Sequence, residues 1–153
     1  MVIAVLDQAS KLWLLFVFEL GERGLVSVLP GIDLVLTWNR GISYGMFQQE
    51  TEIGRWFLLG IQVLAILALG YWMLRSTVTL TGVALGLIIG GAIGNLIDRT
   101  IYGAVVDFVF LNGEIIGWNF RWYVFNLADA AVVAGVIGLV YDSVFARGAA
   151  KAP

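Results

Sequence analysis

The sequence predicts an all-α membrane protein, with four transmembrane helices and a small β-sheet element outside the membrane. Three observations support this fold class. The chain of 153 residues is 60% hydrophobic and only 13% charged, which is more apolar surface than a soluble core of this length needs. Its apolar residues are grouped into long stretches, and one segment between two of these stretches alternates with a period of two.

The four expected helices cover approximately residues 1–20, 56–74, 77–98 and 123–145, within a single integral-membrane domain of residues 1–153. Residues 56–73 and 76–97 contain no charged side chain, and about 20 apolar residues cross a bilayer core of roughly 30 Å. The first stretch contains no cleavable-signal pattern, so we expect a span that begins short or continues before Met1.

The β element is expected at approximately residues 26–47. Ile32, Leu34 and Leu36 alternate with their neighbours after a Pro30-Gly31 turn signal, as in a strand with two unlike faces. The sequence Asn-Arg-Gly at residues 39–41 then indicates a turn into a second strand over residues 42–46.

The composition excludes several classes of function. The sequence pI is about 4.9 and the nine Lys and Arg residues are scattered, so we expect no nucleic-acid partner. The chain has no His and no Cys, which removes thiolate and Ser-His nucleophiles and the usual transition-metal ligands. We expect no metal and no cofactor, and acid-base chemistry must therefore rest on carboxylates.

Two aspartates, Asp107 and Asp129, are the candidate catalytic pair. Asp107 lies among apolar neighbours, where a carboxyl group must be paired or protonated. Asp129 follows Asn126 by three residues, so a purely structural helix cap is an open alternative. The predicted topology brings a loop that carries Asp107 to the membrane face where Asp129 begins its helix. Two carboxyl groups that share a site retain one proton, which supplies one acid and one base.

Other polar residues lie in or beside the predicted spans. Asp7 and Lys11 have the spacing of a helical ion pair, which is again an open structural explanation. Glycines at positions 82, 86, 90 and 94 recur every four residues and permit close helix contact. Packing does not explain the polar end of that helix, namely Asn95, Asp98 and Arg99.

Five motifs together resemble the lipoprotein signal peptidases, the type II signal peptidases of bacterial membranes. They are DQASK (7–11), NRGISYGMF (39–47), GGAIGNLIDR (90–99), GAVVDF (103–108) and FNLAD (125–129). The resemblance covers nearly the whole chain and implies an intramembrane aspartic endopeptidase with Asp107 and Asp129 as its catalytic residues. By motif match it implies substrate-binding or supporting roles for Asn39, Gly41, Asn95, Asp98, Arg99, Asn126, Asp7 and Lys11.

The resemblance also implies the substrate and the location. Members of this family remove the signal peptide of a prolipoprotein by cleaving before a cysteine that bears a diacylglyceryl group. The implied partners are such signal peptides, membrane lipids and the family's cyclic-peptide inhibitors. The implied location is the bacterial cytoplasmic (inner) membrane, in a multi-pass topology with cytoplasmic termini, an outer, periplasmic sheet and an active site near the outer leaflet. The positive-inside count does not support this orientation, which follows from the resemblance alone.

Two other functions fit the residues. A small four-helix ion transporter or channel would use Asp98, Asp107 and Asp129 along a polar path. A non-catalytic membrane assembly factor would need none of the carboxylates for chemistry.

Overall fold

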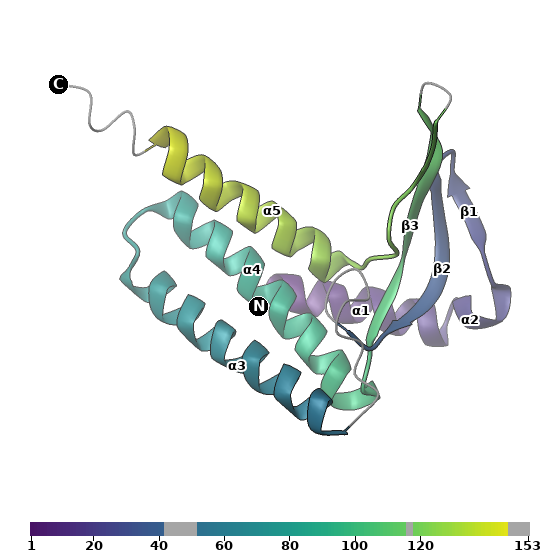
Figure 1. Ribbon diagram of the computed structural model, residues 1–153, viewed down its shortest axis with the longest axis horizontal. Helices are drawn as coiled ribbons and strands as arrows, with labels where there is room; N and C mark the ends of the chain where they lie inside the picture. The colour runs from purple at the N-terminus through teal and green to yellow at the C-terminus, as the bar shows by residue number, and fades with distance from the viewer. Residues whose placement is uncertain (42–51, 116–117, 147–153) are drawn as a thin grey trace.

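Three long helices lie side by side, and an antiparallel sheet stands at one end of them (Figure 1). This computed structural model describes residues 1–41, 52–115 and 118–146. The helices are α1 (Val2–Phe16), α2 (Leu20–Arg23), α3 (Glu52–Arg75), α4 (Thr79–Tyr102) and α5 (Leu127–Tyr141), followed by the π-helical turn η2 (Asp142–Ala146). The strands are β1 (Val26–Leu29), β2 (Ile32–Asn39), β3 (Val105–Ile115) and β4 (Trp118–Arg121).

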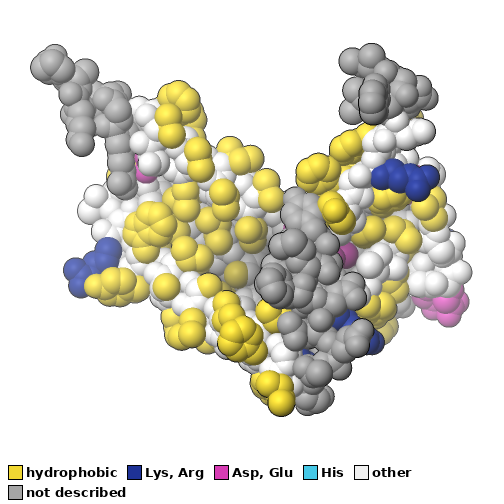
Figure 2. Space-filling view, in the orientation of Figure 1, with side chains coloured by type: hydrophobic (Ala, Val, Ile, Leu, Met, Phe, Trp, Pro, Cys, Tyr) yellow, Lys and Arg dark blue, Asp and Glu magenta, His cyan; other side chains and the backbone are white. Residues whose placement is uncertain are grey.

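Three of the described helices are long and apolar enough to cross a membrane: Ile53–Arg75, Thr79–Tyr102 and Leu127–Phe145. They agree with the second, third and fourth predicted spans to within a few residues. The remaining predicted span, residues 1–20, contains the 15-residue α1 and then the short α2. Since α1 is shorter than the length that crosses a bilayer, four transmembrane helices stay a prediction. Figure 2 shows hydrophobic side chains spread over the helical half of the molecule.

Helix α4 is central, because it contacts α1, α3 and α5. Its glycines explain how closely these helices approach. A Cβ atom at Gly91 would overlap the backbone oxygen of Ala128 in α5, and one at Gly94 would lie 2.5 Å from Asp7 Oδ2 in α1. Gly82 and Gly86, by contrast, have open space. The predicted close contact therefore holds for the polar half of the glycine series and not for the other half.

The four strands form one sheet in the order β1-β2-β3-β4. Strand β2 pairs antiparallel with β3, and this register places Asn39 opposite Val105 and Thr37 opposite Asp107. Strands β1 and β2 confirm the predicted β element for residues 26–39. The second predicted strand, residues 42–46, lies outside the described residues.

The prediction of a loop around Asp107 was wrong, because residues 105–115 form β3. The start of this strand is covered on both faces, so Val105, Val106 and Asp107 are all buried. Alternation is the usual sequence signal of a strand, and it is absent where both faces are covered. The two β-branched residues Val105 and Val106 were the remaining sequence signal of a strand. Gly103 ends α4 with a φ of 73°, a left-handed conformation that turns the chain from the helix into β3.

Candidate active site

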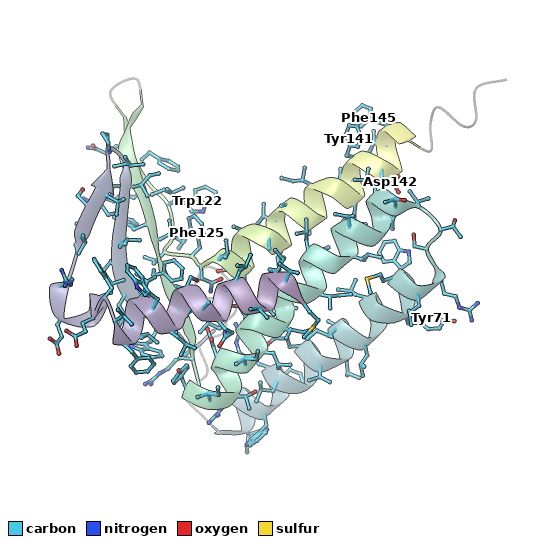
Figure 3. The ribbon with its side chains drawn as sticks, turned by 180° about the vertical axis from the view of Figure 1, so that it is seen from behind. Tyr71, Trp122, Phe125, Tyr141, Asp142 and Phe145 are labelled. Atoms are coloured by element: carbon cyan, nitrogen blue, oxygen red, sulfur yellow. The ribbon has the colours of Figure 1, made fainter. Side chains whose placement is uncertain are left out.

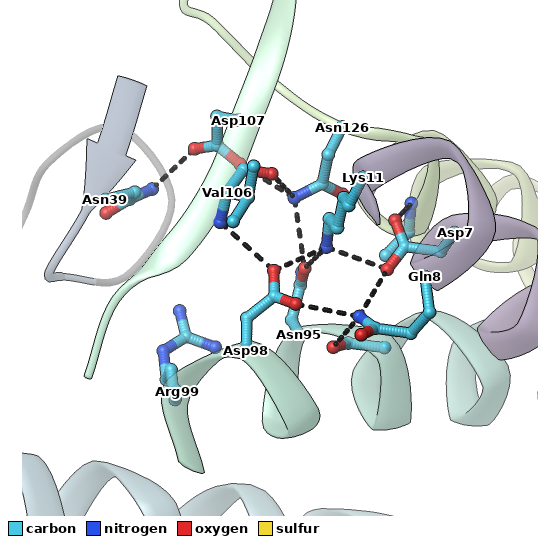
Figure 4. Close-up of polar contacts among 12 residues, drawn as sticks. Asp7, Gln8, Lys11, Asn39, Asn95, Asp98, Arg99, Val106, Asp107 and Asn126 are labelled. Carbon is cyan, nitrogen blue, oxygen red and sulfur yellow. Dashed lines mark hydrogen bonds and ion pairs between the residues drawn. The ribbon is translucent and has the colours of Figure 1, made fainter. Parts of the chain in front are cut away.

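The ten site residues predicted from sequence converge where α1, α4 and the start of α5 meet β2 and β3. Figure 4 labels all of them except Gly41 and Asp129. Each element contributes site residues near one of its ends or on its polar face. Asp7 and Lys11 come from α1, Asn39 and Gly41 from the end of β2, and Asn95, Asp98 and Arg99 from α4. Asp107 lies on β3, and Asn126 and Asp129 lie at the start of α5.

A buried ammonium group holds two of the carboxylates. Lys11 Nζ lies 2.7 Å from Asp7 Oδ2 and 2.7 Å from Asp98 Oδ2, and all three residues are at most 1% exposed. The predicted helical ion pair is therefore present, and Asp98 extends it to a second helix. Gln8, which sequence reasoning missed, also donates to Asp98 Oδ1 at 2.7 Å. A polar amide within an apolar segment was the available signal.

The carboxylates of this ion-pair cluster also accept hydrogen bonds from the backbone beside each candidate catalytic residue. Asp98 Oδ2 accepts from the N–H of Val106 at 3.0 Å, one residue before Asp107. Asp7 Oδ1 accepts from the N–H of Ala128 at 3.0 Å, one residue before Asp129. The ion-pair cluster therefore fixes the backbone of both segments that carry the pair.

Asn126 connects the pair directly. Its Nδ2 donates to Asp107 Oδ1 at 2.7 Å, while its Oδ1 accepts from the N–H of Asp129 at 2.9 Å. Asp129 Oδ2 in turn accepts from the Asn126 N–H at 3.3 Å, which completes a capping box. The cap that sequence offered as a structural alternative is present, and the same amide also contacts the other carboxylate.

Asp107 is the more enclosed of the two carboxyl groups. It is 2% exposed, and its Oδ2 accepts from Asn39 Nδ2 at 3.1 Å. Burial, reinforced by the nearby charge of Asp129, raises the pKa of Asp107 to about 7, against the lowering effect of the hydrogen bonds from Asn39 and Asn126. A carboxyl group with this pKa exchanges a proton near neutral pH.

Asp129 is half-buried and is oriented by α4. Its Oδ1 accepts from Asn95 Nδ2 at 2.8 Å. Asn95 Oδ1 accepts from Lys11 Nζ at 3.1 Å and from Asn126 Nδ2 at 3.0 Å. Because Asn95 both donates and accepts, its amide links the ion-pair cluster to both candidate catalytic residues.

Both carboxyl groups line one groove of about 470 Å³ between α5 and the sheet. Its polar residues Asn39, Asp107 and Asp129 are accompanied by apolar side chains from β3, from the segment between β4 and α5, and from α5 itself. These are Leu111, Trp122, Val124, Phe125, Ala130, Val133, Ala134 and Ile137. Figure 3 shows Trp122 and Phe125 between the sheet and the start of α5. The groove thus places two carboxyl groups within a mostly apolar lining.

Arg99 does not contact the aspartate pair by a hydrogen bond. Its guanidinium donates to Gln62 Oε1 at 3.1 Å and to the backbone oxygen of Gly41 at 2.9 Å. Among the described residues there is no group of three or more His, Cys, Asp and Glu residues placed to hold a metal ion.

Comparisons with known proteins agree on one family. A family model described as signal peptidase (SPase) II matches residues 1–145. A lipoprotein signal peptidase of Nitrobacter hamburgensis is 59% identical over 149 residues, which cover 97% of this chain and 91% of that protein. One from Rhodopseudomonas palustris is 58% identical with the same coverage.

Solved structures give a similar fold. A bacterial membrane enzyme structure at 2.3 Å, obtained by the in meso method, superposes with a TM-score of 0.75 at 28% identity. The match covers 93% of this chain and 85% of that one. A second such structure at 1.9 Å gives a TM-score of 0.74 at 27% identity, over 94% and 88% of the two chains.

Proposed function

Because the chain belongs to the signal peptidase II family, and is thus a membrane protease, we propose that Asp107 and Asp129 are its catalytic dyad. The single observation that supports this most is the shared contact with Asn126. One amide donates to Asp107 Oδ1 and accepts from the Asp129 N–H, and both carboxyl groups line the same groove. Family membership also favours a peptidase over the ion-transporter alternative.

In the proposed mechanism Asp107 holds the shared proton and Asp129 acts as the base. Its pKa of about 7 suits Asp107 to the role of acid. The Asp129 carboxylate takes a proton from a water molecule, whose oxygen attacks the scissile carbonyl carbon. Asp107 hydrogen-bonds the carbonyl oxygen and stabilises the developing negative charge. When the C–N bond breaks, the proton taken by Asp129 passes to the leaving amine, and the hydroxyl stays on the acyl product.

The proposed substrate is a prolipoprotein whose signal peptide is cleaved before a diacylglyceryl-modified cysteine. The apolar side chains along α5, including Ala130, Val133, Ala134 and Ile137, support an apolar substrate segment beside the dyad. We further propose that residues 1–153 form one integral-membrane domain in which α1 is a fourth span. In this arrangement the termini are cytoplasmic and the sheet lies on the periplasmic side of the inner membrane.

The test is cleavage of a purified prolipoprotein by the purified enzyme, with and without prior diacylglyceryl modification of the substrate. We expect the modified substrate to be cut before its cysteine and the unmodified one to be cut far more slowly. Asp107→Asn and Asp129→Asn proteins should cut neither. Cleavage of both substrates at equal rates would overturn the substrate proposal, and cleavage by either variant would overturn the dyad.

A further inference from the structure

Gln62 is a polar side chain in the middle of the apolar helix α3, and both ends of its amide are used. Its Nε2 donates to the backbone oxygen of Ala92 in α4 at 2.7 Å. Its Oε1 accepts from Arg99 NH1 at 3.1 Å. A glutamine in a membrane span must find such partners, but the second partner is a cation at the edge of the active site.

The hydrogen bonds continue from Arg99 to Asp107. Arg99 NH2 donates to the Gly41 oxygen at 2.9 Å. The Gly41 N–H donates to Asn39 Oδ1 at 3.0 Å, and Asn39 Nδ2 donates to Asp107 Oδ2 at 3.1 Å. Because the Asn39 oxygen is held by Gly41, its NH₂ group must face Asp107. The orientation of this amide therefore depends on where the Gly41 peptide is held.

The Arg99 guanidinium has no salt bridge within the described part of the chain, where both salt bridges belong to Lys11. Its hydrogen-bond acceptors are the Gln62 side chain and the Gly41 backbone. Arg55 acts differently, because its NH2 donates to the backbone oxygens of Arg99 and Thr100 at 3.0 and 2.9 Å. Arg55 holds the end of α4, whereas Gln62 fixes the direction of the guanidinium itself.

We propose that Gln62 is a positioning residue for Asp107, acting through Arg99, Gly41 and Asn39. The inference rests on the proposed dyad, since it assigns Gln62 to the same reaction. Without the Gln62 oxygen, the guanidinium loses one of its two acceptors and the Gly41 peptide is held less firmly. The Asn39 amide then spends less time donating to Asp107. The carboxyl group is therefore held less firmly in the orientation that the reaction needs, and its ionised form is stabilised less.

The first test is Gln62→Met, which keeps the length and the apolar surface of the side chain but removes both hydrogen bonds. We expect kcat to fall about 3- to 10-fold, as for the loss of roughly one hydrogen bond, with KM within about twofold. The pH-rate limb that reports Asp107 should move to higher pH. The charged groups that act on Asp107 are Asp129 of α5, Lys11 of α1 and Arg99 of α4. The substitution replaces none of them, but it removes one hydrogen-bond acceptor of Arg99.

The matched control is Leu59→Ala, three residues earlier on the same helix. Leu59 is 7% exposed, so its truncation loosens packing without touching the hydrogen-bond chain. We expect Leu59→Ala to lower the melting temperature and to leave the pH-rate limb in place. A shift of the limb in Leu59→Ala equal to that in Gln62→Met would overturn the proposal, since packing alone would then explain both.

A double-mutant cycle with Asn39→Ala tests the route. If Gln62 acts through Asn39, Gln62→Met added to Asn39→Ala should change kcat by less than about twofold; effects that multiply would contradict the route.

If Gln62→Met does not fold, Gln62→Glu replaces it, because an ionised carboxylate accepts from Arg99 but cannot donate to Ala92. Near-wild-type kcat is expected for Gln62→Glu, and a loss exceeding tenfold would overturn the proposal. Activity in Asp107→Asn would refute the dyad itself, whereas a normal Gln62→Met beside an inactive Asp107→Asn would refute only the role of Gln62.

Discussion

The two ends of the α4–α5 pair both contain buried carboxyl groups, but they use them differently. At the end far from the sheet, where Figure 3 shows Asp142, the Thr81 hydroxyl donates to Asp142 Oδ2 at 2.6 Å and joins the two helices. At the sheet end, Asp98, Asp107 and Asp129 come together with Asp7 of α1. Joining two helices does not require four carboxyl groups.

The difference shows at which end the burial of carboxyl groups opposes folding. At the far end the buried carboxyl group of Asp142 accepts a hydrogen bond from the Thr81 hydroxyl. At the sheet end, burial and a neighbouring charge raise the pKa of Asp107 to about 7. Folding alone would favour fewer charges here. A destabilised group that the surrounding structure holds in place is typical of an active site.

The largest expected contrast is in activity. Asp107→Asn and Asp129→Asn should each lower kcat/KM by at least about 10³-fold, because each removes one half of the proposed acid-base pair. Asp142→Asn should leave kcat/KM within about threefold, because its carboxyl group lies at the other end of the helices. Prolipoprotein cleavage measures the activity of the three purified proteins, and circular dichroism measures whether they are folded. An Asp142→Asn protein that folds but is inactive would contradict the difference in function between the two ends.

Lys11→Met tests how the sheet end holds its charges. The substitution leaves Asp7 and Asp98 buried without their ammonium partner, and such a break costs about 3 to 5 kcal/mol of unfolding free energy. Denaturant titration in detergent micelles measures the loss. Adding Asp7→Asn and Asp98→Asn to Lys11→Met should recover part of it, since no unpaired charge then remains. A loss below about 1 kcal/mol in the single variant would mean that water reaches this cluster.

The pH dependence follows from Asp107. Its pKa is raised from 3.8 in the unfolded chain to about 7 in the folded protein. The folded state therefore binds this proton more tightly, so its stabilising contribution is complete below about pH 4 and is lost as the pH rises through 7. The same deprotonation removes the proposed catalytic acid, so kcat/KM should fall above about pH 7.

Asp107→Asn provides the control for this pH effect. Its unfolding free energy should not show the decline between pH 4 and 7 that Asp107 contributes to the wild-type protein. Thermal unfolding at a series of pH values compares the two proteins. An identical decline in Asp107→Asn would assign the pH effect to another group.

The residues that the sequence singled out lie close together in the structure, but the contacts between them could not be predicted from the sequence. Charge-free stretches identified α3 and α4, and the spacing of Asn126 and Asp129 identified the helix cap, since both signals are local. The strand that carries Asp107 was missed because its first residues are buried on both faces and therefore show no alternation. The chain from Gln62 to Gly41 through Arg99 joins residues 37 and 58 positions apart, and no local pattern encodes such contacts.

Thr81→Val gives the smallest expected effect and the sharpest test of the far end. Valine matches threonine in shape but cannot donate to Asp142, and the lost hydrogen bond is worth roughly 1 kcal/mol. We expect a lower melting temperature and an unchanged kcat/KM, whereas Asn126→Ala at the sheet end should lower both, because Asn126 caps α5 and also contacts Asp107. A decrease of kcat/KM in Thr81→Val beyond about threefold would show that the far end is coupled to the dyad through α4 and α5.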